Sequence, residues 1–169
     1  MSAERDIERL YRQNGHVVLR RARALLRSDA EAHDALHDVF LDLLRRPEQL
    51  DGVARPIAWL YRATTHHCLN RLRNRDGRAR ILRALPRAED PSPRGERSAE
   101  LRELLARLPE PLAEVAVYYY LDEMTHEEIA GVLGCSRRHV GDLVDRLRCH
   151  VAAESLDPRV GTPGRAFEG

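Results

Sequence analysis

Residues 125–151 read THEEIAGVLGCSRRHVGDLVDRLRCHV and decide the fold of the C-terminal half of the chain. Thr125 and Glu128 have the spacing of a capping box, which predicts the start of a short helix. Gly134 is suited to the left-handed conformation that ends such a helix, and Ser136 is suited to cap the next one. The inward positions of that second helix follow helical spacing and are Val140, Leu143, Val144, Leu147 and Val151. Two helices joined by a short turn containing glycine form a helix-turn-helix.

The start of the second helix carries the residues that would contact DNA. N-terminal residues of a recognition helix reach base edges in the major groove, and its first backbone amides face phosphate. The residues at that position are Ser136, Arg137, Arg138 and His139. An ordinary helical hairpin inside a bundle is the alternative, because Gly141 weakens the helix, while Asp142 and Asp145 repel phosphate.

A linker is predicted on the N-terminal side of this domain. Residues 84–100, ALPRAEDPSPRGERSAE, show no helical periodicity and contain three prolines and a glycine. They predict a flexible linker between a first domain, residues 1–83, and a second domain, residues 101–153. Residues 154–169 predict a disordered tail.

The first domain is predicted to be a bundle of helices. Ser28 and Glu31 again have capping-box spacing, and Pro47 ends the helix that follows. The core-facing stripe of that helix is Leu36, Val39, Phe40, Leu43 and Leu44. A further helix is expected from Pro56 to about Arg75, since proline is favoured at the first helical position. No segment clearly predicts a strand, so the fold class is all-α, with two small helical domains joined by a flexible linker.

Charge is distributed unevenly along the chain. All 28 basic residues are arginine, and the formal net charge of +1 combines a balance of +6 over residues 1–86, −1 over residues 87–100 and −4 over residues 101–169. Arginines and asparagines gather near the end of the last helix of the first domain and beyond it, and the predicted DNA contacts there are Asn70, Arg71, Arg73, Arg75, Arg78 and Arg80. Arginine displaces counterions from phosphate and asparagine hydrogen-bonds to base edges, so the cluster predicts nucleic-acid binding. A solvated helix end stabilised by the helix dipole is the alternative.

The helix of residues 29–46 has an outer face of a different kind. It carries the carboxylates of Asp34, Asp38 and Asp42 together with His37 and Leu41. An acidic face with an exposed leucine is suited to dock a basic protein surface, and a plain solvated face is the alternative.

Several classes of protein are not indicated. No apolar run approaches the roughly 18 residues of a membrane span, and the charged N-terminal segment is unlike a secretory signal. Cys68, Cys135 and Cys149 are too scattered for a disulfide framework, so we expect a soluble, cytoplasmic protein with reduced thiols and no membrane insertion. The neighbouring His66, His67 and Cys68 lack the spacing of a structural zinc site, and no phosphate-binding loop or hydrolase motif occurs. We therefore expect no cofactor, no metal and no enzyme activity.

The order of these features resembles the extracytoplasmic-function (ECF) class of bacterial sigma factors over about residues 5–152. Residues 29–44 resemble the polymerase-docking helix of sigma region two. Residues 56–75 resemble the helix of the same region that melts the promoter and reads the minus-ten element, and residues 104–148 resemble region four.

The resemblance implies partners and contacts. Core RNA polymerase would be bound through its β′ clamp helices and its β flap, promoter DNA would be bound by both domains, and an anti-sigma factor would regulate the protein. The implied contacts to the clamp helices are Asp34, His37, Asp38, Phe40 and Leu41. The implied contacts to minus-ten DNA are Asn70, Arg71, Arg73 and Arg75. Gly141 and Leu143 stand where the family usually has basic residues. Arg137, Arg138 and Arg146 are therefore expected to bear more of the binding to the minus-thirty-five element.

The predicted function is that of an ECF-type sigma factor that directs promoter recognition and opening. A helix-turn-helix regulator acting without core polymerase is one alternative, and it would not need the acidic docking helix. A sigma mimic that sequesters an anti-sigma factor is another, and it would not need the arginines. A metal-dependent enzyme or sensor is a third, and it would use the histidines and cysteines.

Overall fold

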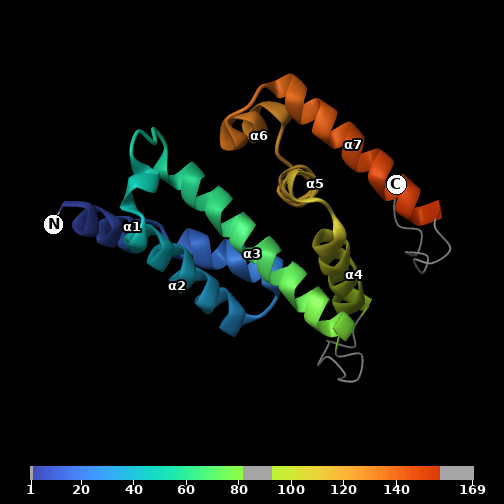
Figure 1. Ribbon diagram of the computed structural model, residues 1–169, viewed down its shortest axis with the longest axis horizontal. Helices are drawn as coiled ribbons and strands as arrows, with labels where there is room; N and C mark the ends of the chain where they lie inside the picture. Colours follow the sequence, from blue (N-terminus) through green and yellow to red (C-terminus); the bar gives the residue numbers. More distant parts are fainter. Residues whose placement is uncertain (1, 82–92, 157–169) are drawn as a thin grey trace. The chain divides into compact units, whose positions relative to one another are not determined.

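The computed structural model describes residues 2–81 and 93–156, with side chains in residues 4–78 and 98–154. The chain divides into two compact units, residues 1–86 and 87–169 (Figure 1). Throughout the described residues the regular secondary structure is helical, which confirms the all-α fold class.

The first unit is a bundle of three long helices. They are α1 Ser2–Leu26, α2 Asp29–Arg45 and α3 Pro56–Ile81, with the short 3₁₀ helix η1 Pro47–Leu50 between the last two. Helix α1 packs along both α2 and α3, and α2 also contacts α3 (Figure 1). Apolar side chains from the three long helices meet in one core, which consists of Ile7, Val18, Leu36, Val39, Phe40, Leu43 and Leu60.

Most of the helix boundaries predicted from capping residues and prolines in this unit agree with the structure. The Ser28 side chain caps α2 by accepting a hydrogen bond from the Glu31 backbone N–H at 3.3 Å, and Pro47 follows the end of that helix. Leu44, predicted to face the core, is 47% exposed, because it lies at the margin of the apolar stripe. Helix α3 continues past its predicted end at Arg75 to Ile81, since arginine and alanine are good helix formers and Gly77 alone does not stop it.

A buried arginine links α1 to α3. Arg21 is almost fully buried, with its guanidinium 4.3 Å from the centre of the Tyr61 ring. It donates to the Thr65 hydroxyl oxygen at 3.2 and 3.3 Å, while that hydroxyl donates to the Tyr61 carbonyl. Cation–π and hydrogen-bonding contacts therefore compensate a cation that would otherwise be costly to bury.

The second unit consists of α4 Pro93–Arg107, α5 Glu110–Ala116, η2 Val117–Leu121, α6 His126–Leu133 and α7 Arg137–Leu156. Helices α5 and α6 pack against α7, and α4 contacts α5. Its buried apolar residues include Leu105, Leu108, Leu112, Val115, Ile129, Val140, Leu143, Val144 and Leu147.

Two boundaries of the second unit differ from the sequence expectation. Helix α4 begins at Pro93, inside the segment expected to be irregular, because proline is tolerated in a first helical turn and several helix formers follow it. Helix α7 extends to Leu156, past the expected start of the tail. The rest of the predicted tail, residues 157–169, and residues 82–92 of the predicted linker region lie outside the described residues.

The segment η2 is π-helical and changes which aromatic ring is buried. Sequence periodicity places Tyr119 and Tyr120 on the apolar stripe, but Tyr120 is 47% exposed and Tyr118 is fully buried. The hydroxyl of Tyr118 donates to Glu114 Oε1 at 3.1 Å. The wider turn of a π-helix shifts the phase of the residues within it, so an α-helical count fails across this segment.

Candidate nucleic-acid interface and docking face

The turn between α6 and α7 is built by the capping residues that the sequence predicts. The Glu128 backbone N–H donates to the Thr125 hydroxyl oxygen at 3.2 Å, and the Thr125 backbone N–H donates to Glu128 Oε2 at 2.8 Å. The Thr125 backbone N–H and the Thr125 hydroxyl both donate to Glu128 Oε2, and these two bonds hold the pKa of the Glu128 carboxyl below its ordinary value. Gly134 has φ of 66°, and the His139 backbone N–H donates to Ser136 Oγ at 3.2 Å. The helix-turn-helix is therefore confirmed together with its caps.

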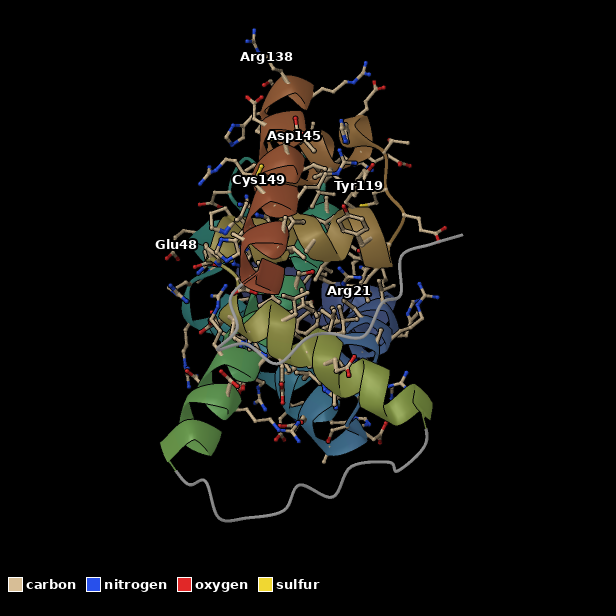
Figure 2. The ribbon with its side chains drawn as sticks, turned by 90° about the vertical axis from the view of Figure 1, so that its right-hand side faces the viewer. Arg21, Glu48, Tyr119, Arg138, Asp145 and Cys149 are labelled. Atoms are coloured by element: carbon tan, nitrogen blue, oxygen red, sulfur yellow. The ribbon has the colours of Figure 1, made fainter. Side chains whose placement is uncertain are left out.

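The predicted recognition residues are accessible at the start of α7. Ser136, Arg137, Arg138 and His139 are all exposed, and Figure 2 shows Arg138 at the N-terminal end of α7, projecting away from the helices. Arg146 is also exposed, two turns further along the helix. The unpaired backbone amides of a helix N-terminus and the arginines next to them form a positive end suited to phosphate and base contacts.

Neither Leu143 nor Gly141 offers DNA a side chain on the surface of α7. Leu143 is 4% exposed and belongs to the core, so its side chain is unavailable to DNA. Gly141 is partly buried, and an added Cβ there would lie 3.9 Å from the His126 Nδ1 atom of α6. The exposed side chains at this level of α7 include those of Asp142, Asp145 and Arg146.

Two of the predicted DNA-binding arginines of α3 are held by carboxylates of α2. Arg71 Nη2 donates to Asp38 Oδ2 at 2.7 Å, and Arg71 Nη1 lies 3.8 Å from Asp34 Oδ2. One turn along α3, Arg75 Nη1 lies 3.4 Å from Glu31 Oε2. The first domain therefore contains an ion-pair network between α2 and α3, formed by Glu31, Asp34, Asp38, His67, Arg71 and Arg75.

His67 completes the contacts of Arg71 within the α2–α3 ion-pair network. Arg71 Nε donates to His67 Nε2 at 3.2 Å. This histidine nitrogen also lies 3.2 Å from Asp38 Oδ2. The hydrogen bond from Arg71 lowers the pKa of the Asp38 carboxyl, with a further contribution from His67. Asp38 is therefore ionised at neutral pH and is a charged partner of Arg71.

The remaining predicted contacts of α3 are more solvent-facing or lie outside the described side chains. Arg73 Nη1 donates to Asn70 Oδ1 at 3.3 Å, and Asn70 is exposed. Arg78 is exposed. Arg80 lies within α3, but its side chain is outside the described set. The structure thus brings Arg71 and Arg75 together with α2.

The predicted docking face of α2 is present, with one correction. Asp34, His37 and Leu41 are exposed, and Leu41 retains 45% of its surface. Phe40 is only 4% exposed, because its ring packs in the core with its centre 4.9 Å from that of Tyr11 in an edge-to-face contact. Phe40 therefore supports the face from below, and the expectation that it is itself a surface contact is wrong.

Two apolar side chains close to this face are more exposed than helical periodicity predicts. Leu44 and Tyr11 are 47% and 40% exposed, and Tyr11 contacts Phe40 beneath α2. Helical spacing with Ile7 and Leu10 places Tyr11 on an apolar stripe, as the spacing in α2 does for Leu44, and only the packing of α1 on α2 shows how much of each remains uncovered. The position of Leu44 at the margin of the stripe is the one signal available from the sequence.

The three cysteines lie in different environments. Burial raises the pKa of the Cys68 thiol to about 12, so it is a neutral core group. Cys135 and Cys149 are free cysteines at partly buried and exposed positions. Among the residues that the structure describes, no three His, Cys, Asp or Glu side chains converge to hold a metal ion. None of the helices in this part of the chain is long and apolar enough to cross a membrane.

A helical bundle with an arginine-bearing helix, followed by a helix-turn-helix, is typical of DNA-binding proteins. The model of the family Sigma-70 region 2 matches residues 10–78, and that of Sigma-70, region 4 matches residues 98–147. Together the two matches span more than half of the 169 residues, in the order region 2 then region 4. The chain therefore belongs to the sigma-70 family of transcription initiation factors. This family consists of transcription factors and is not a family of enzymes.

Among solved structures, the chain is similar to the sigma factor RpoE from Bartonella quintana, crystallised in complex with the anti-sigma factor NepR. The TM-score is 0.52 at 15% sequence identity, and the match covers 88% of this chain and 95% of that chain. At this level of identity the likeness shows a shared fold. No curated protein sequence matches the chain.

Proposed function

We propose that this protein binds core RNA polymerase and directs it to promoters, where it recognises and opens the minus-ten region. The observation that carries the proposal is the match of regions 2 and 4, in that order, to the two compact units. In this account the protein performs no covalent chemistry, acts in the cytoplasm and needs no cofactor. Capture of unstacked bases by the first domain would offset the few kcal/mol that strand opening costs.

The docking face of α2 is the proposed contact to the β′ clamp helices. Its exposed members include the acidic Asp34, the partly exposed Asp38 and the apolar Leu41. Acidic side chains would guide the approach of a basic partner surface, and burial of the leucine would contribute affinity. The second domain is proposed to contact the β flap.

The DNA contacts are proposed to divide between the two units. Helix α3 would approach the minus-ten element through the residues Asn70, Arg71, Arg73, Arg75, Arg78 and Arg80. Helix α7 would enter the major groove of the minus-thirty-five element through Ser136, Arg137, Arg138, His139 and Arg146. The exposure of the four residues at the start of α7 supports this assignment.

An anti-sigma factor is the proposed regulator. The similar sigma factor RpoE was crystallised with the anti-sigma factor NepR, and an exposed face that docks polymerase is also available to a competitor. We propose that such a partner covers the docking face or the DNA-binding helices until a signal releases it.

Equilibrium binding to core polymerase tests the docking assignment. Labelled full-length protein would be titrated with core enzyme, with Leu41→Asp as the test variant and Ile57→Asp as its matched control. Both are apolar side chains of the first unit, exposed to 45% and 38%, but Ile57 lies on α3 and outside the docking face. We expect Leu41→Asp to weaken binding at least tenfold, since it places an uncompensated charge in a buried contact, and Ile57→Asp to have little effect.

Two outcomes would contradict the proposal. Equal affinities for Leu41→Asp and the unsubstituted protein would remove Leu41 from the interface. No binding of core by the unsubstituted protein would instead favour a helix-turn-helix regulator or a sigma mimic. Those two are separated by duplex DNA binding without polymerase, which only the regulator requires.

A further inference from the structure

The α2–α3 ion-pair network, formed by Glu31, Asp34, Asp38, His67, Arg71 and Arg75, joins two surfaces to which separate roles have been proposed. Asp34 and Asp38 belong to the docking face of α2, whereas Arg71 and Arg75 belong to the DNA-binding set of α3. The shortest link is the bond of 2.7 Å between Arg71 Nη2 and Asp38 Oδ2. The Arg71 guanidinium, which is expected to bind a DNA phosphate, therefore binds the Asp38 carboxylate of the same chain.

The arginines are turned towards α2 by several contacts. Arg71 contacts Asp38, Asp34 and His67, and its side chain is only 27% exposed. Arg75 repeats the arrangement one turn later with Glu31, at 3.4 Å. A carboxylate and a phosphate are alternative partners for one planar guanidinium fork, since both use the same N–H donors.

We propose that the carboxylates of α2 compete within the molecule with DNA for Arg71 and Arg75. In the free protein the ion pairs then reduce the affinity of the first domain for DNA. Because Asp38 also belongs to the docking face, polymerase docking and DNA binding use the same carboxylate, and a basic partner that pairs with Asp38 would release Arg71. The inference rests on the proposed function only in taking Arg71 and Arg75 as DNA contacts.

The size of the effect follows from the setting of the ion pairs. Partly exposed pairs contribute little because water screens them, so their loss should change DNA affinity by roughly two- to fivefold. A newly available arginine should also add one phosphate contact, which steepens the dependence of log affinity on log salt by about 0.7 for a single strand. The salt slope therefore reports whether a phosphate contact is gained.

Asp38→Asn and Asp42→Asn make a matched pair for the test. Both remove one negative charge from α2, and the two carboxylates are 45% and 47% exposed. Asp42 pairs at 3.1 Å with Arg46, the residue that follows α2, and Arg46 is outside the proposed DNA-binding set. A general change in electrostatics affects both variants alike, whereas release of Arg71 follows only from Asp38→Asn.

The experiment measures binding of full-length protein, without polymerase, to a fluorescent single-stranded DNA of mixed sequence over a range of salt concentrations. We expect Asp38→Asn to bind two- to fivefold more tightly than the unsubstituted protein, with the steeper salt slope, and Asp42→Asn to keep the original slope. The gain should disappear when Asp38→Asn is combined with Arg71→Ala. Circular dichroism would confirm that each variant is folded, and Glu31→Gln, which releases Arg75, provides a second route if Asp38→Asn is not.

Equal gains and slopes for Asp38→Asn and Asp42→Asn would overturn the inference. A gain that persists in the Arg71→Ala background would do the same, as would a lack of measurable DNA binding by every variant. Core binding and transcription are separate measurements, so a protein that transcribes normally but shows equal gains would lose this inference and keep its proposed function.

Discussion

Gly134 and Gly141 lie on either side of the start of α7. The backbone conformation requires glycine at position 134 but not at position 141. Gly134 occupies the left-handed region with φ of 66°, which strains any residue that carries a side chain. Gly141 lies inside α7, where glycine reduces helix stability, and an added Cβ would make only ordinary contacts with His126.

Substituting each glycine with alanine should therefore change stability in opposite directions. We expect Gly141→Ala to raise the free energy of unfolding by about 0.5–1 kcal/mol, because alanine has the higher helix propensity. Gly134→Ala should lower it by about 1 kcal/mol or more, because the turn requires a positive φ. Urea unfolding followed by circular dichroism measures both, and a destabilising Gly141→Ala would contradict the packing described around His126.

Single residues also show where sequence reasoning succeeds and where it stops. Thr125, Ser136 and Gly134 were predictable, since caps and turns depend on a few neighbouring residues. The pairing of Arg71 with Asp38 was not, because it depends on how α3 is placed along α2. The sequence shows both charges, but it does not specify the register between two helices.

At the scale of elements, periodicity predicted the helices and most of their buried faces, and failed where geometry departs from a regular α-helix. The π-helical η2 exchanges the expected burial of Tyr120 for that of Tyr118. The stripe of α2 was predicted correctly except at its margin, where Leu44 remains exposed. The proposed docking residues of α2 were harder to predict than its core, because Phe40 and Leu41 are neighbours in sequence and only Leu41 faces solvent.

Substitution of the tyrosines of η2 tests which of them is buried by the π-helical geometry. Tyr118→Phe removes the hydrogen bond to the buried Glu114 carboxyl, and we expect the free energy of unfolding to fall by about 1–3 kcal/mol. Tyr120→Phe, at an exposed position in the same element, should change it by less than about 0.5 kcal/mol. Denaturant titration of both variants gives the comparison. A larger loss for Tyr120→Phe would favour the uninterrupted α-helical phase.

At the scale of the whole molecule, the near-neutral net charge of +1 conceals two units with different balances. In the basic first unit, some of the positive charge is neutralised within the unit, because acidic residues of α2 form ion pairs with arginines of α3. Composition predicted the asymmetry, and the motifs predicted two DNA-binding units. Neither could show that α2 carboxylates contact the arginines expected to bind DNA.

The function proposed for this chain is to make core RNA polymerase start transcription at promoters that core does not use alone. Its most direct test is run-off transcription with core polymerase and a library of genomic promoter fragments, with and without the protein. Transcripts with defined start sites should appear only when the protein is present, should be lost with Leu41→Asp, and should persist with Ile57→Asp. Absence of any protein-dependent transcript, from a folded protein across the whole library, would contradict the account.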